Sequence, residues 1–127
     1  MAQFTLTVYR NRTVANTVTL YQADGTTGVA LVSGDKVRLK AYRRNGATPV
    51  LDMVSGAALS GGSSITITSL TSPATATVTF DQDDTTSLDP GTYSCEILVM
   101  DSADGSRIKH AQQGILYLLP AGAGGVT

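Results

Sequence analysis

Apolar and polar residues alternate along most of the chain with a period of two, which is typical of β-strands with one buried face. Near the N-terminus, for example, Phe4, Leu6 and Val8 alternate with threonines. The alternation predicts strands over residues 3–9, 13–21, 36–42, 49–53, 65–68, 75–80, 93–100 and 108–119. Late in the seventh of these segments both faces become apolar, so we expect that strand to be central in its sheet.

Turn signals separate the predicted strands. Asp24-Gly25, Asn45-Gly46 and Asp104-Gly105 are dipeptides that favour tight turns. The acidic segment 81–88 interrupts the alternation and predicts one short helical turn capped by an aspartate. Seven or eight strands, about ten residues apart and joined by such turns, predict an all-β protein with the fold of an antiparallel β-sandwich.

The length of 127 residues fits one domain. Because the strand pattern fills residues 1–119, we assign them to a single sandwich domain. Residues 120–127 are rich in glycine and alanine and have no periodicity, so we predict a flexible tail there.

Charge is sparse, and this narrows the possible partners. Charged residues make up 15% of the chain and the formal net charge is −1, so no overall field attracts nucleic acid or anionic lipid. No segment has the pattern of a secretory signal or a membrane span, so we expect synthesis in the cytoplasm without signal-peptide export and no membrane partner. The 18 threonines favour strands and a surface that makes its contacts through neutral groups.

Two residues could carry catalysis. His110 is the only histidine, but the chain has no Gly-x-Ser-x-Gly elbow, and Lys109 and Gln112 nearby indicate an exposed strand position. Cys95 is the only cysteine, which excludes an intramolecular disulfide and a Cys-based zinc site. Its register with Tyr93 predicts a small core residue rather than a reactive thiol. We therefore predict no catalytic residue and no enzyme activity.

Two charged clusters could bind ligands. Asp81, Asp83 and Asp84 could offer oxygens to Ca²⁺, but the glycine and distal glutamate of an EF-hand loop are missing, which favours a helix cap. The second cluster is a basic strand face and hairpin formed by Arg38, Lys40, Arg43 and Arg44. These residues could contact phosphate, but they lack a series of interleaved aromatics to stack on bases. A solvated or salt-bridged face is therefore favoured. No glycine-rich phosphate loop is present, and we expect no metal and no cofactor.

The segment from Leu88 to Cys95 contains Asp89-Pro90-Gly91-Thr92-Tyr93 and resembles the tyrosine corner of immunoglobulin-like domains. The resemblance implies an immunoglobulin-like sandwich in which Asp89, Gly91 and Tyr93 form a structural corner and the tyrosine hydroxyl bonds back to the chain. The chain lacks the earlier cysteine and the core tryptophan of true immunoglobulin domains, so only the architecture is carried over.

A second resemblance spans about residues 28–119. The order of segments is similar to that of immunoglobulin-like modules in tailed-bacteriophage virions, such as the N-terminal domain of phage upper baseplate proteins. The segments that carry it are Gly34-Asp35, Val50-Leu51-Asp52, 61–67, 76–80, 88–93, 99–105 and 114–118. The resemblance implies a component of the virion with other virion proteins, major capsid or tail proteins, as partners, arranged as a homo-oligomer or symmetric array.

Three functions of different class follow. The first is a non-enzymatic structural protein of the virion, either a capsid decoration (cement) protein or a tail or baseplate component. The second is a carbohydrate or host-surface binding module, with Tyr9, Tyr21, Tyr42 or Tyr117 as the stacking platform in the absence of tryptophan. The third is an enzyme, for which the acid, base and nucleophile inventory is thin.

The two ends of the chain are the predicted contact elements. The first strand is β-prone and uncharged, and a bare edge of this kind pairs with other chains unless something covers it. Small residues in the tail let a backbone lie close to a neighbour. The candidate interface residues are Phe4, Leu6, Val8, Arg43, Arg44, Pro120 and Val126.

Overall fold

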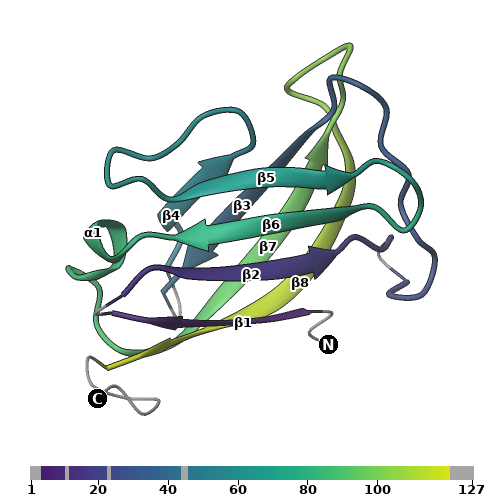
Figure 1. The fold of residues 1–127 in the computed structure, drawn as a ribbon. Helices are drawn as coiled ribbons and strands as arrows, with labels where there is room; N and C mark the ends of the chain where they lie inside the picture. The colour runs from purple at the N-terminus through teal and green to yellow at the C-terminus, as the bar shows by residue number, and fades with distance from the viewer. Residues whose placement is uncertain (1–3, 11, 23, 44–45, 121–127) are drawn as a thin grey trace.

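The computed structural model describes residues 4–10, 12–22, 24–43 and 46–120, and this part of the chain folds into two facing β-sheets (Figure 1). The strands are β1 (Phe4–Tyr9), β2 (Val14–Thr19), β3 (Lys36–Tyr42), β4 (Pro49–Val54), β5 (Ser64–Ser69), β6 (Thr75–Phe80), β7 (Gly91–Met100) and β8 (Ile108–Leu119). A single helical turn, α1 (Gln82–Thr85), follows β6. No helix in the described ranges is long and apolar enough to cross a membrane.

The strand order confirms the all-β sandwich predicted from the sequence. One sheet has the order β1-β8-β7-β3-β4, and the other has the order β2-β6-β5. Strand β2 pairs with β6 and β3 pairs with β7. These pairs correspond to B–E and C–F of immunoglobulin-like sandwiches when β4, which lies beside β3, is counted as an additional strand. Strand β7 lies third of five in its sheet, which confirms the expected central strand.

One strand pair, β1 with β8, is parallel, whereas the other pairs of named strands in the described chain are antiparallel. Strands β1 and β2 belong to different sheets, and β1 runs beside β8 with Phe4 opposite Gly114. The Phe4 ring occupies the space above this glycine, since a Cβ at residue 114 would lie only 2.5 Å from the ring. The periodicity of the sequence predicts the strand β1 but does not indicate which strand pairs with it.

The core lies between the sheets and contains the apolar half of each alternating strand. Phe80, Leu39, Ile97 and Leu116 are among the largest fully buried side chains, and they come from both sheets. The predicted helix cap is confirmed: the Asp81 side chain accepts a hydrogen bond from the backbone N–H of residue 83, at 3.0 Å.

Candidate interaction surfaces

The structure corrects part of the interface predicted on the first strand. Leu6 is 1% exposed and Val8 is 0% exposed, so both side chains belong to the core and cannot contact another chain. Phe4 is half-buried against Gly114. The outer edge of β1 is also partly covered, because the Asn16 side-chain amide donates to the carbonyl oxygen of residue 7 at 3.3 Å.

The other predicted interface residues lie in different environments or outside the described residues. Pro120 is exposed, and Arg43 is exposed at the end of β3, where its guanidinium lies 3.6 Å from the carboxylate of Asp89. Arg44 and Val126 lie outside the described residues, as do Asn45 of the predicted turn and all of the tail after Pro120.

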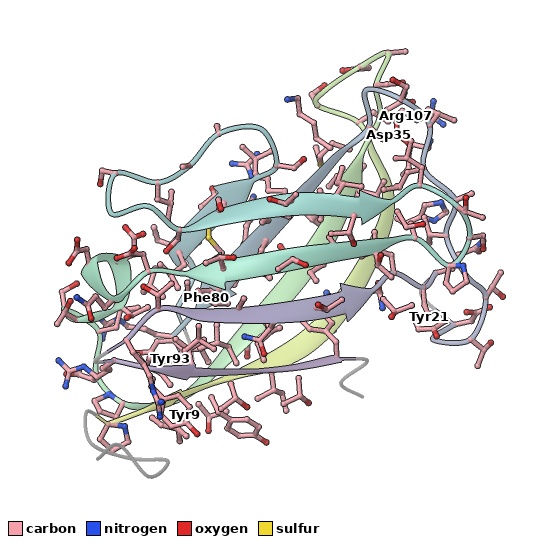
Figure 2. All side chains as sticks on the ribbon, viewed as in Figure 1. Tyr9, Tyr21, Asp35, Phe80, Tyr93 and Arg107 are labelled. Carbon is pink, nitrogen blue, oxygen red and sulfur yellow. The ribbon has the colours of Figure 1, made fainter. Side chains whose placement is uncertain are left out.

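The tyrosine corner is formed by the loop that enters β7. The Tyr93 hydroxyl donates a hydrogen bond of 2.5 Å to the carbonyl oxygen of Asp89, and the Tyr93 side chain is 5% exposed. Gly91, between them, has φ of +151°, a region that L side chains rarely adopt. The hydroxyl therefore ties the start of β7 to the loop before it (Figure 2).

Replacing Tyr93 with phenylalanine should lower the free energy of unfolding by about 1–2 kcal/mol, because the carbonyl of Asp89 loses its donor in a partly buried place. Urea denaturation measures the change. Tyr117→Phe is the matched control, since that tyrosine is 40% exposed. Equal stability of Tyr93→Phe and the native chain would contradict a structural role for the corner.

The basic face of β3 is neutralised by acids of its own sheet. The Arg38 guanidinium donates two hydrogen bonds of 2.7 Å to the Asp52 carboxylate on β4. These bonds outweigh partial burial and hold the pKa of Asp52 below its ordinary value. Lys40, the next basic residue on this face, lies between Asp52 and Glu96 in the sheet register. The arrangement is that of a salt-bridged face.

The candidate catalytic and metal-binding residues are placed in structural roles or apart from one another. Burial raises the pKa of the Cys95 thiol to about 12, so the buried side chain stays protonated and behaves as a core residue. The Asp84 carboxylate accepts the backbone N–H groups of Gly61 and Ser63 at 3.1 and 2.9 Å. His110 is half-buried on β8. Within the described ranges, no group of three or more His, Cys, Asp or Glu side chains could hold a metal ion.

Two sequence comparisons add no relationship. No protein family model matches the chain, and no curated protein is detectably similar to it. The surfaces of the sandwich are therefore the basis for any inference about function.

The outer face of the three-stranded sheet is covered by threonine. Strands β2, β6 and β5 bury their apolar residues and turn the alternate residues outward, toward the viewer in Figure 1. We call this surface the threonine face; it consists of Ala15, Thr17, Thr19, Ser64, Thr66, Thr68, Thr75, Thr77 and Thr79. Sequence reasoning missed it, although Thr-x-Thr occurs in all three strands.

The four tyrosines that could stack on a sugar differ in their exposure to solvent. The Arg12 guanidinium lies 4.3 Å from the centre of the Tyr9 ring, and Tyr42 is half-buried with its hydroxyl 3.3 Å from Glu96. Tyr21 is also half-buried. Tyr117 is the most exposed of the four, on the outer face of the five-stranded sheet opposite Thr92 of β7.

Proposed function

We propose that this chain is a non-enzymatic structural protein of a tailed-bacteriophage virion that acts by packing against other virion proteins. The site would be the capsid exterior, as a decoration or cement protein, or the tail or baseplate. Two features support this role. One is the resemblance of residues 28–119 to virion modules, and the other is the uncharged threonine face on the surface.

The absence of charge on that face supports a packing role. Strands β2, β5 and β6 contain no Asp, Glu, Lys or Arg. Soluble proteins usually carry charged side chains of both signs across their surfaces, and these charges limit association. Burying threonine methyls and hydroxyls costs much less desolvation free energy than burying a charge. The face is thus suited to contact with another protein surface.

A carbohydrate or host-surface binding role is the second candidate, and the exposed Tyr117 favours it. Its ring lies on the outer face of the five-stranded sheet, where it is accessible for stacking on a sugar. A single exposed aromatic ring is weaker support than the broad neutral face.

Quantitative mass spectrometry of purified virions from the phage that encodes the chain tests the proposal. We expect the chain in the particle: a copy number on the order of hundreds indicates the capsid, and one of about six or twelve indicates the tail or baseplate. Absence from the particle would overturn the proposal. Binding of the purified chain to a glycan array, lost on Tyr117→Ala, would favour the second candidate instead.

A further inference from the structure

We propose that the threonine face binds the same face of a second copy of this chain, so that two three-stranded sheets pack against each other. The inference deepens the proposed function, on which it rests for the crowding that brings copies together, by naming the surface and the partner.

The hydroxyl groups on the face are largely without partners in the described part of the chain. Thr17 on β2 and Thr66 on β5 flank Thr77 at the centre of the face. The hydroxyls of Thr68 and Thr75 lie 2.7 Å apart and bond to each other, whereas no bond to the described residues is formed by these three central hydroxyls. A regular array of outward donors and acceptors is therefore open to water or to a partner.

A hydroxyl both donates and accepts hydrogen bonds, so a threonine face complements its own copy in many registers. In a two-fold symmetric contact every residue near the axis meets itself, and a charged residue there would face a like charge. The threonine face contains no charged residue, which removes this repulsion. β-branched side chains on two facing sheets also interdigitate well.

Other partners match the face less well. Nucleic acid, anionic lipid and charged peptides need opposite charges, and the face has none. Sugars are usually held by stacking on an aromatic ring, and no member of the face is aromatic. A second copy satisfies the neutral hydroxyls without requiring either feature.

The area of the face predicts a weak contact. Three strands about 4.8 Å apart and six residues long cover about 14 by 20 Å, or roughly 300 Å² on each copy. A stable protein complex usually buries about 800 Å² on each partner. The pair should therefore be sparse in dilute solution and should form where copies are concentrated or held in an array.

Cross-linking through an introduced cysteine tests the geometry. Thr77→Cys places a thiol at the centre of the face, and Thr92→Cys is the matched control on the exposed start of β7 in the other sheet. The native Cys95 is buried and does not compete. At high protein concentration under mild oxidation, we expect at least about tenfold more covalent dimer from Thr77→Cys than from Thr92→Cys. Equal yields from the two variants would overturn the inference.

Charge placement gives an independent measurement. At high protein concentration, the native chain should show concentration-dependent association in sedimentation equilibrium, and its absence there would overturn the inference. Thr77→Lys should abolish this association, whereas Thr92→Lys should retain it; thermal melts of both variants check folding. Association that survives Thr77→Lys would overturn the inference, and so would a neutral polysaccharide that binds the native chain, but not Thr77→Lys, without self-association. If virions contain the chain but Thr77→Cys does not cross-link, the pairing of threonine faces is wrong and the proposed function stands. If Thr77→Cys cross-links but virions lack the chain, the proposed function is wrong.

Discussion

Replacing Asp35 with alanine should lower the free energy of unfolding by about 3 kcal/mol. The side chain of Asp35 is 0% exposed and joins three segments at one end of the sandwich (Figure 2). Its carboxylate accepts the backbone N–H of Val32 at 3.0 Å, the backbone N–H of Ser102 at 2.9 Å and the ammonium group of Lys109 at 3.0 Å. Alanine leaves two backbone donors and one cation without their acceptor, which is the physical reason for the loss.

A half-exposed ion pair supplies the control. Asp52 pairs with Arg38 on the sheet surface, where the two side chains are 34% and 37% exposed, so Asp52→Ala should cost about 1 kcal/mol or less. Chemical denaturation of both variants gives the comparison. If Asp35→Ala proves no more destabilising than Asp52→Ala, the stabilising role of the three hydrogen bonds to Asp35 is contradicted.

The same residue makes stability depend on pH in a defined direction. Burial alone would raise the pKa of Asp35, but the hydrogen bonds from Val32, Lys109 and Ser102 together hold it below its ordinary value. An unfolded aspartate has a pKa of about 4, so the stabilisation is present above about pH 4 and is lost as the pH falls through the lower folded pKa. Asp35→Asn should therefore lose less stability than the native chain when the pH is lowered from about 4 to 2.

Replacing Phe80 with alanine should have the other large effect, a loss of about 3–5 kcal/mol. Phe80 ends β6, is 0% exposed and fills the space between the two sheets. Truncation removes buried apolar surface and leaves a cavity that two rigid sheets close only in part.

The chain provides its own control, because its only other phenylalanine is Phe4. Phe4 is half-buried on the edge strand β1, so Phe4→Ala should cost about 1–2 kcal/mol. Urea denaturation with far-UV circular dichroism measures both variants. Similar losses for the two variants would contradict the placement of Phe80 in the core between the sheets.

Much of the architecture could be predicted from the sequence because a strand with one buried face alternates by two residues. This rule located all eight strands of the described chain and the central position of β7. The helix cap at Asp81 was predicted instead from the acidic segment that interrupts the alternation. The candidate surface was harder to predict. The edge residues Leu6 and Val8 were expected at an interface and are in the core. Alternation assigns residues to two faces of a strand, but it does not say what covers each face.

The sequence by itself determined the class of fold, the turns and the scarcity of charge, since these depend on local periodicity and composition. Only the tertiary structure decided which strands became neighbours. It brought β2, β6 and β5 together, although many residues separate β2 from the other two, and so combined three short Thr-x-Thr runs into one surface. It also placed Asp35 against Ser102 and Lys109, which are far away in the chain. Both arrangements depend on long-range strand pairing, which is decided by how the whole core packs and not by any local segment.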